Sequence, residues 1–301
     1  MNNKPLVSII MNCYNGELYL KKALESVLSQ TYTNWELIFW DNQSQDKSEK
    51  IFKTYKDRRF KFYKSLDHTV LYEARNKAIQ KSSGELIAFL DVDDFWLPSK
   101  LEKQIELFAD TKTGLVYSNF WILNTNSFFK KKIFSRKKLP NGNVLKAMLL
   151  NYSVGLSTII IRKKNIKNIN NVFNVKYDLL ADYDFIINFS IKNEFQCIQK
   201  PTTFIRVHDK GTSYLYKDKQ IQQLKSWYNS IQSNKILSSQ IEMKKVYERI
   251  EYMEVMQIIF EKNFFQSFKR VLKFPFGIKK LKLVLALILP KNIFLQIKRF
   301  N

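Results

Sequence analysis

The sequence has few of the residues that define several common classes of protein. Seven glycines and six prolines in 301 residues make the chain neither fibrous nor low-complexity. None of the glycines forms a GxGxxG or GxxxxGK(S/T) pattern, so a dinucleotide or Walker-type phosphate cradle has no support. Two cysteines, Cys13 and Cys197, provide no disulfide framework or zinc spacing and favour a reducing compartment. Two histidines leave little room for histidine-based metal sites or triads.

The chain has instead a large apolar fraction and a strong excess of positive charge. Hydrophobic residues make up 45% of it and aromatic residues 15%, which is ample for the core of one large or two small domains. Fifty lysines and arginines against 27 acidic residues give a net charge of +23. Such an excess is typical of proteins that bind nucleic acid, an anionic membrane or phosphorylated substrates. A coding bias toward Lys, Asn and Ile is the alternative, although it does not explain where the charges lie.

A short apolar stretch followed by carboxylates is the most informative part of the sequence. Residues 86–90 predict a buried strand in a parallel sheet, and Asp91, Asp93 and Asp94 come directly after it. Side chains alternate along a strand, so Asp91 and Asp93 should point the same way. Adjacent carboxylates repel each other unless a cation lies between them, and oxygen ligands suit Mg²⁺ or Mn²⁺ carrying substrate phosphates. The alternative is a solvated loop in which Asp94 caps a helix that starts at Pro98.

Strand and helix patterns alternate along most of the chain, which indicates βαβ units around a parallel sheet. Ligands of such sheets bind beyond the carboxyl ends of the strands, where these aspartates lie. The basic, polar residues 124–143 predict a loop or hairpin. The predicted strands are residues 6–11, 35–40, 60–63, 86–90, 114–118, 157–162 and 203–207, and the predicted helices are residues 18–28, 44–55, 73–81 and 182–191 and the one from Pro98.

From about Lys217 the sequence changes to long, Lys- and Gln-rich helical patterns without strand signals. From Lys262 onward it has ten basic residues and no acidic ones. The apolar stretch within residues 279–290 is far shorter than the roughly 20 residues that span a bilayer. A basic helix with Phe and Leu on its other side fits the membrane interface, and a helix packed on the N-terminal domain is the alternative. The N-terminus leads directly into a strand, so no signal peptide is expected.

Four segments together resemble the family 2 glycosyltransferases, in that family's order and spacing over roughly residues 5–210. They are VSIIMNCYN, WELIFWDNQSQD, EARNKAIQKSSGELIAFLDVDD and LADYDF. The resemblance implies an α/β catalytic domain of the GT-A (nucleotide-diphospho-sugar transferase) fold over residues 1–216, with a mostly parallel central sheet flanked by helices. Residues 217–301 are then a helical, basic C-terminal region that is expected to associate with a membrane.

The resemblance implies that the loop after the first strand and the end of the second strand hold the nucleotide. Asn12, Tyr14 and Asp41 take these positions, with Tyr14 stacking on a pyrimidine and Asp41 accepting a hydrogen bond from the ring N–H. The alternatives are a core aromatic for Tyr14 and a helix cap for Asp41. Two nearby segments, residues 41–46 and 67–69, lack the glycine that the family usually has there.

The resemblance also implies sites for the diphosphate and for a divalent metal ion. Arg75 would pair with the diphosphate, and a surface ion pair with Glu73 or Asp67 is the alternative. Asp91 and Asp93 would bind Mn²⁺ or Mg²⁺, and Asp91 also the nucleotide-sugar, so that the ion assists departure of the nucleoside diphosphate. Further candidates around this ion are Asp94 and, from an RxH pattern, Arg206 and His208.

The family's catalytic base maps to Asp182. Inverting transfer needs one carboxylate opposite the leaving group to deprotonate the acceptor hydroxyl. The glutamate that usually precedes this aspartate is replaced by Ala181, whereas the aspartate itself is present. One alternative makes Asp182 the N-cap of the predicted helix 182–191. The other makes Asp184 the base, if the register differs.

These residues predict an inverting, divalent-metal-dependent glycosyltransferase. It would move a sugar from a nucleotide-sugar, which we expect to be UDP-linked, to a hydroxyl of a glycan or lipid-linked acceptor in lipopolysaccharide, O-antigen or capsule synthesis. The basic C-terminal region suggests an anionic membrane surface as a partner and a cytoplasmic location at the inner face of the cell membrane. The alternative is a catalytically inactive basic module of the same fold that binds anionic lipid or nucleic acid. We do not expect nucleic acid as the partner, because the donor-site and catalytic residues occur together.

Overall fold

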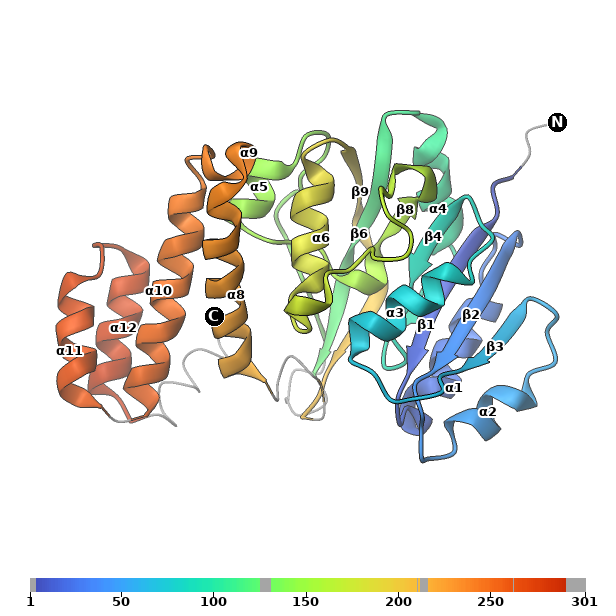
Figure 1. Cartoon of the computed structure of the whole chain (residues 1–301), viewed down its shortest axis with the longest axis horizontal. Helices are drawn as coiled ribbons and strands as arrows, with labels where there is room; N and C mark the ends of the chain where they lie inside the picture. Colours follow the sequence, from blue (N-terminus) through green and yellow to red (C-terminus); the bar gives the residue numbers. More distant parts are fainter. Residues whose placement is uncertain (1–3, 125–130, 210, 212–215, 262, 291–301) are drawn as a thin grey trace. The chain divides into compact units, whose positions relative to one another are not determined.

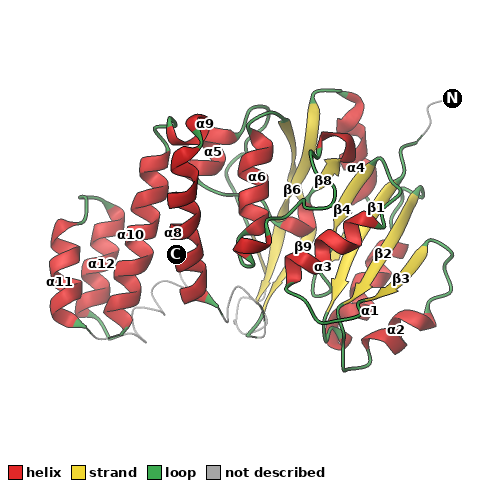
Figure 2. Ribbon diagram, viewed as in Figure 1, coloured by secondary structure: helices red, strands yellow, loops and turns green. Residues whose placement is uncertain are grey.

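A computed structural model describes residues 4–124, 131–209, 211, 216–261 and 263–290 of the protein. The chain divides into two compact units, Met1–Leu215 and Tyr216–Asn301 (Figure 1). The N-terminal unit contains the sheet, and the described part of the C-terminal unit is helical (Figure 2).

Nine strands form one sheet within the described part of the N-terminal unit. They are β1 (Val7–Cys13), β2 (Trp35–Asp41), β3 (Phe60–Lys64), β4 (Leu86–Phe89), β5 (Phe95–Trp96), β6 (Thr113–Asn124), β7 (Lys131–Ile133), β8 (Ile160–Arg162) and β9 (Glu194–Val207). Their order is β3-β2-β1-β4-β8-β6-β9-β5, with β7 beside β6. Strands β3, β2, β1 and β4 pair in parallel, whereas β8 runs antiparallel to both of its neighbours. The carboxyl ends of β1, β2 and β4 therefore lie at one edge of the sheet.

Helices cover the sheet because their apolar residues recur on one face. In the described N-terminal unit they are α1 (Glu17–Leu28), α2 (Ser48–Thr54), α3 (Leu71–Gln80), α4 (Lys100–Glu106), α5 (Leu145–Leu150) and α6 (Ala181–Ser190). The buried stripe of α1 and Leu101 of α4 pack with the fully buried strand β1 in one apolar cluster. Packing in this core thus fixes the positions of the strands whose ends carry the predicted site residues.

Two predicted segments differ from the structure near these strand ends. Helix α4 begins at Lys100 with Ser99 in the N-cap position, so the prediction of a helix starting at Pro98 and capped by Asp94 is wrong. The predicted strand 157–162 is confirmed only from Ile160 onward. Leu156–Thr158 is a 3₁₀ turn instead, because the Thr158 backbone N–H and hydroxyl both donate to the carbonyl oxygen of Gly155.

Other helices and strands begin or end at residues that differ from the prediction, because contacts between distant segments set these ends. Helix α2 begins at Ser48 rather than at Ser44, because Ser44 and Asp46 accept hydrogen bonds from the backbone N–H groups that precede and open α1. Strands β6 and β9 are much longer than predicted, because they pair with each other along most of their length. The predicted hairpin at 124–143 is seen as the β6–β7 pairing, and residues 125–130 lie outside the described residues.

Lys100 is fully buried, and its amine should make stability depend on pH. Its Nζ donates to Gln104 Oε1 at 2.6 Å and lies 4.1 Å from the Trp96 ring centroid. Burial lowers the pKa of Lys100 well below its usual value. The unfolded chain therefore binds a proton that the folded chain does not, and this group destabilises the fold as pH falls below about 10.

Lys100→Met removes that proton linkage while keeping a similar side-chain volume. We expect the variant to become more stable relative to wild type as pH is lowered from 10 toward 7. The difference in the free energy of unfolding should increase by about 1.4 kcal/mol per pH unit, as long as the pH is above the pKa of Lys100 in the folded chain. Urea titrations of both proteins at several pH values measure this difference. Lys103→Met, on the exposed side of the same helix, is the matched control and should show no such trend.

The described C-terminal unit consists of helices with a small core of their own. They are α8 (Lys217–Ser230), α9 (Lys235–Ser238), α10 (Met243–Phe260), α11 (Phe264–Lys273) and α12 (Ile278–Ile288). Val255 of α10, Val271 of α11 and Leu283 of α12 lie in one buried apolar cluster. Among the described residues, no helix combines the length and apolar character needed to cross a bilayer.

Candidate functional site

The predicted site residues gather where β1, β2 and β4 end. Asn12 lies near the end of β1, Asp41 is the last residue of β2, and Asp91 follows β4. Parallel pairing brings Cys13 beside Asp41 and Ile10 beside Phe89. The carboxyl edge of the sheet is where ligands of open α/β sheets bind.

The three aspartates after β4 form a turn rather than the end of a strand. The Asp94 backbone N–H donates to the Asp91 carbonyl oxygen at 3.0 Å, and the strand itself stops at Phe89. The alternation argument for Asp91 and Asp93 is therefore wrong, because residues in a turn do not alternate. The turn instead gathers all three side chains, with one carboxylate oxygen of each within 4.8 Å of the others.

Arg75 of α3 is the main countercharge of this cluster. Its guanidinium is buried and forms an ion pair with Asp91. Burial alone would lower the pKa of Arg75, but the charge of Asp91 and its hydrogen bond to Arg75, together with Tyr72 and Asp182, raise this pKa above its usual value. Glu73 pairs with Lys77 at 2.9 Å, so the alternative of a surface ion pair for Arg75 is wrong.

Asp93 and Asp94 connect the turn to the end of β9 in different ways. Asp93 Oδ2 lies 3.0 Å from Nε2 of His208. Asp94 is buried and accepts from the Ser157 hydroxyl at 2.6 Å and from the Arg206 backbone N–H at 2.9 Å. Both oxygens of Asp94 are thus engaged by protein donors, whereas Asp91 and Asp93 remain partly exposed.

Arg206 contributes its backbone to the site rather than an ion pair with the aspartates. Its guanidinium lies over the rings of Tyr19 and Phe95, 5.0 and 5.2 Å from their centroids. Among the described residues, the buried Nε of Arg206 and Nδ1 of His208 have no hydrogen-bond partner. These two nitrogens are therefore unsatisfied polar atoms in residues that contact Asp94 and Asp93.

A second group of unpartnered polar atoms lies at the ends of β1 and β2. Asn12 is 7% exposed, and neither its Nδ2 nor its Oδ1 has a hydrogen-bond partner within the described part of the chain. Asp41 is fully buried and its Oδ1 accepts from the Ser44 backbone N–H at 3.3 Å, whereas its Oδ2 has no partner there. Helix α2 starts at Ser48, so Asp41 is not its cap. Unsatisfied buried polar atoms cost about 1–3 kcal/mol each, which a ligand carrying donors and acceptors would offset.

Tyr14 lies beside this group and is not a core residue. Its side chain is 52% exposed, and its ring centroid is 4.2 Å from that of His68. The His68 ring contacts the Asn42 carbonyl oxygen through Nδ1 at 2.9 Å, and Asn42 Nδ2 donates to the Thr69 carbonyl oxygen. An exposed aromatic pair next to buried, unpartnered amide and carboxylate groups suits a planar heterocycle.

Asp182 lies in the first turn of α6, where Leu180 takes the N-cap position. The alternative of an N-cap role for Asp182 is therefore wrong. Burial raises the pKa of Asp182, and hydrogen bonds from the Tyr72 hydroxyl and the Tyr183 backbone N–H, with the charge of Arg75, only partly offset this. Asp184 Oδ1 accepts a hydrogen bond from Asn188 Nδ2 at 2.9 Å on the same helix.

Tyr72 is the residue of this site that the sequence pattern does not predict. The predicted helix begins at Glu73, whereas α3 begins at Leu71 and so carries Tyr72 and Arg75 on one face. The guanidinium carbon of Arg75 lies 4.7 Å from the Tyr72 ring centroid. Asp91, Arg75, Tyr72 and Asp182 therefore form a continuous chain of contacts across the site.

The cluster fits a divalent cation that prefers oxygen ligands. Asp91 and Asp93 offer partly exposed carboxylates, and His208 lies against Asp93. Asp94 is the least available of the three aspartates because protein donors occupy both of its oxygens. Mg²⁺ and Mn²⁺ prefer oxygen ligands, with only a few from the protein and with positions left open for phosphate oxygens. This cluster matches that preference.

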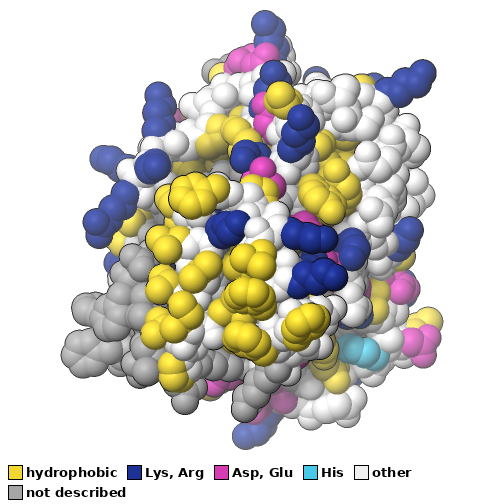
Figure 3. All heavy atoms as spheres, turned by 90° about the vertical axis from the view of Figure 1, so that its left-hand side faces the viewer, with side chains coloured by type: hydrophobic (Ala, Val, Ile, Leu, Met, Phe, Trp, Pro, Cys, Tyr) yellow, Lys and Arg dark blue, Asp and Glu magenta, His cyan; other side chains and the backbone are white. Residues whose placement is uncertain are grey.

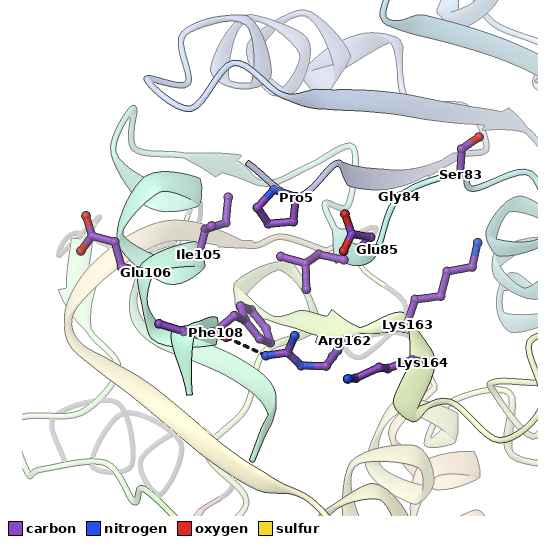
Figure 4. Close-up of a pocket in the computed structure, with 12 residues that line it drawn as sticks. Pro5, Ser83, Gly84, Glu85, Ile105, Glu106, Phe108, Arg162, Lys163 and Lys164 are labelled. Carbon is purple, nitrogen blue, oxygen red and sulfur yellow. Dashed lines mark hydrogen bonds between the residues drawn. The ribbon is translucent and has the colours of Figure 1, made fainter. Parts of the chain in front are cut away.

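A separate cavity of about 690 Å³ opens at the other edge of the sheet (Figure 4). Pro5, before β1, and Glu85, before β4, line it together with Arg162 at the end of β8. The Arg162 guanidinium donates to backbone carbonyl oxygens, including that of Phe108 at 2.7 Å. Glu85 and Glu106 also line this cavity, but none of the buried, unpartnered side-chain atoms found among the described residues belongs to its lining.

Comparison with known proteins gives consistent matches. A family model described as Glycosyl transferase family 2 matches residues 8–168. The Escherichia coli UDP-Glc:alpha-D-GlcNAc-diphosphoundecaprenol beta-1,3-glucosyltransferase WfgD is 36% identical over 156 residues, which cover 52% of this chain and 60% of that protein. The E. coli enzyme WfaP, described by the same reaction, is 35% identical over 204 residues, or 67% of this chain and 78% of that protein.

A solved structure extends the likeness to most of the chain. The crystal structure of S. aureus TarS residues 1–349 in complex with UDP-GlcNAc matches with a TM-score of 0.58 at 16% identity. The match covers 96% of this chain and 80% of that one. At this identity the likeness concerns the fold alone.

Proposed function

Because the chain belongs to Glycosyl transferase family 2 and has the GT-A fold, we propose that it is an inverting, divalent-metal-dependent glycosyltransferase that uses a UDP-sugar. The observation that carries this proposal is the gathering of Asp91 and Asp93 between the Asn12–Asp41 group and Asp182. Each of these three parts suits one part of the reaction: a metal-bound diphosphate, a nucleobase and an acceptor hydroxyl.

The proposed reaction assigns one role to each group. Asn12 and Asp41 would pair with the uracil edge, and Tyr14 would stack on its face. Arg75 would hold the diphosphate. A Mn²⁺ or Mg²⁺ ion held by Asp91 and Asp93, with His208 beside them, would supply neutralisation of the leaving diphosphate.

Asp182 would remove the proton from the acceptor hydroxyl as that oxygen attacks the anomeric carbon. The new glycosidic bond forms while the bond to the diphosphate breaks on the opposite face, so the configuration inverts. A carboxylate whose pKa is raised by burial is a stronger base than an ordinary aspartate. Tyr72 would orient Asp182 through its hydroxyl.

The acceptor is proposed from the relatives. WfgD and WfaP are described as acting on a diphosphoundecaprenol-linked sugar. We propose that this chain likewise extends a lipid-linked glycan in cell-surface polysaccharide synthesis, as for lipopolysaccharide, O-antigen or capsule. Such an acceptor would place the enzyme on the cytoplasmic side of the cell membrane, with residues 217–301 as the membrane-associating region and residues 1–216 as the catalytic domain.

Calorimetry of UDP, GDP and dTDP with and without Mn²⁺ tests the donor assignment. We expect UDP to bind with a Mn²⁺-dependent affinity and the other two nucleotides to bind more weakly. Binding of none of the three by folded protein, together with binding of a random oligonucleotide at physiological salt, would favour the inactive basic module instead. Transfer from UDP-sugars to a lipid-diphosphate-linked sugar then tests the reaction itself.

Tyr72→Phe should change the pH dependence of the reaction more than its maximum rate. The hydroxyl donates to Asp182 and opposes the effect of burial, so its loss should raise the pKa of Asp182 further. As pH is lowered, the rate of the variant should begin to fall at a higher pH than the rate of wild type, because less of Asp182 is deprotonated at a given pH. A pH profile of kcat/KM measures the shift, and the value at high pH should drop less than about tenfold.

Tyr117→Phe is the matched control, because that tyrosine is also buried and its hydroxyl donates to the Pro140 carbonyl oxygen. Its acid limb should coincide with that of wild type. An unchanged acid limb for Tyr72→Phe would show that the hydroxyl does not act on the base.

A further inference from the structure

The apolar residues of α11 and α12 divide into two sets. The inner set, which includes Val271 and Phe274 from the α11 segment and Leu283 and Ala286 of α12, packs against α10. The outer set is exposed and consists of Phe264, Phe265, Phe268, Leu272, Phe276, Ile278, Leu281, Leu285 and Ile288. Within the described part of this unit the inner set forms the helical core, and no residue of the outer set belongs to that cluster.

This outer set forms a continuous surface, which we call the α11–α12 apolar face. Phe264, Phe268 and Leu272 recur every four residues on α11, and Leu281, Leu285 and Ile288 lie four and then three residues apart on α12, so each set shares one helix face. Phe276, in the turn between the helices, is 100% exposed, and Phe265 is 81% exposed. Figure 3 shows hydrophobic side chains gathered with lysines and arginines around them.

The charges that α11 and α12 themselves carry are all of one sign. Residues 263–290 contain six lysines and arginines and no acidic residue. Arg270 pairs with Glu251 and Glu254 of α10. Lys269, Lys273 and Lys282 are exposed, and the ion pairs among the described residues do not include them.

We infer that the α11–α12 apolar face is a membrane-docking surface that inserts its phenylalanines among anionic lipids. Aromatic and aliphatic side chains backed by uncompensated lysines match the boundary between headgroups and acyl chains. A second copy of the chain fits this face less well, because a two-fold contact would bring the same unpaired cations together. The inference rests on the proposed membrane association and identifies the surface responsible for it.

The structure thereby changes which residues carry the contact. The apolar stretch within residues 279–290 does not lie free on an interface, because Leu283 and Ala286 are buried in the helical core. The two most exposed apolar side chains of the face, Phe276 and Phe265, belong instead to the turn between the helices and to α11. An amphipathic helix inserts through such an exposed stripe, and the buried stripe only anchors it to its unit.

Co-sedimentation of the full chain with vesicles tests this inference. We expect binding to vesicles that contain phosphatidylglycerol and weak binding to phosphatidylcholine alone. Phe264→Ser/Phe265→Ser/Phe268→Ser should lower the vesicle affinity by about tenfold or more. Ile236→Ser/Ile241→Ser removes exposed apolar residues elsewhere in the same unit and should leave the affinity unchanged.

A charge variant and a fluorescent reporter separate the two components of binding. Lys269→Gln/Lys273→Gln/Lys282→Gln should abolish the preference for phosphatidylglycerol. Addition of anionic vesicles should shift the tryptophan emission of Phe265→Trp to shorter wavelength by more than it shifts the emission of wild type. Equal vesicle binding by wild type and the triple phenylalanine variant would overturn the inference. So would a wild-type dimer that the same variant converts to a monomer.

Mn²⁺-dependent UDP binding, measured on the same proteins, separates this inference from the proposed catalytic function. All the variants should bind UDP as wild type does, because their substitutions lie in α9, α11, α12 and adjoining residues. Wild-type protein that binds UDP but does not bind anionic vesicles would contradict the docking surface alone. A protein that binds vesicles but no nucleotide contradicts the transferase proposal alone.

Discussion

Asp182→Asn is expected to lower kcat by about 10²–10⁴-fold, the usual contribution of a general base. Asparagine has nearly the same shape, and its Oδ1 can still accept the hydrogen bonds from Tyr72 and Tyr183. It cannot take the proton of the acceptor hydroxyl. Nucleotide affinity should stay within about twofold of wild type, because Asp182 is proposed to act on the acceptor and not on the nucleotide.

Asp184→Asn is the matched control for this experiment. Asp184 lies on the same helix, two residues away, and bonds Asn188. Its substitution should change kcat by less than about threefold. Steady-state rates with a lipid-linked acceptor measure both variants. A larger loss for Asp184→Asn than for Asp182→Asn would assign the base to Asp184 and would contradict the proposed mechanism.

The pH profile gives a second measurement on the same base. Burial raises the pKa of Asp182, so the wild-type rate should begin to fall at a higher pH than an ordinary aspartate would produce. The acid limb reports loss of the deprotonated base as pH decreases. The residual activity of Asp182→Asn should lack this limb.

Asp93→Ala is expected to lower the Mn²⁺-dependent affinity for UDP by about 100-fold or more, since even residues that only support metal ligands contribute about 10–100-fold. The substitution removes one of the two partly exposed carboxylates of the cluster. It also removes the partner of His208 Nε2. The weak affinity for UDP without metal should not change, because Asp93 is proposed to contact the nucleotide only through the ion.

Two controls accompany this variant in calorimetry with and without Mn²⁺. Glu106→Ala removes an exposed carboxylate that lines the cavity at the opposite edge of the sheet, and it should leave UDP binding unchanged. Asp94→Asn should weaken metal-dependent binding less than Asp93→Ala, because Asp94 mainly holds Ser157 and the Arg206 backbone. Unchanged Mn²⁺-dependent binding by Asp93→Ala would contradict the proposed metal site.

The sequence by itself determines the elements that form the carboxyl edge of the sheet. The apolar runs of β1, β2 and β4 are short, continuous and separated by helical stripes, which is the pattern of buried parallel strands. Parallel strands end at the same edge, so Asn12, Asp41 and Asp91 can be expected to lie together without any coordinates. Local periodicity carries this information because burial of each face depends on spacing within one segment.

Only the tertiary structure decides which partners these residues have. Sequence spacing offers Glu73 or Asp67 to Arg75, but the way α3 packs on the sheet points Arg75 at Asp91. The contact between Tyr72 and Asp182 joins two helices far apart in the chain, and no pattern within either helix encodes it. Likewise, the division of the α11 and α12 side chains into inner and outer sets depends on where α10 lies. Such contacts depend on how separate elements pack, because a side chain's partners are set by distance in space rather than by position along the chain.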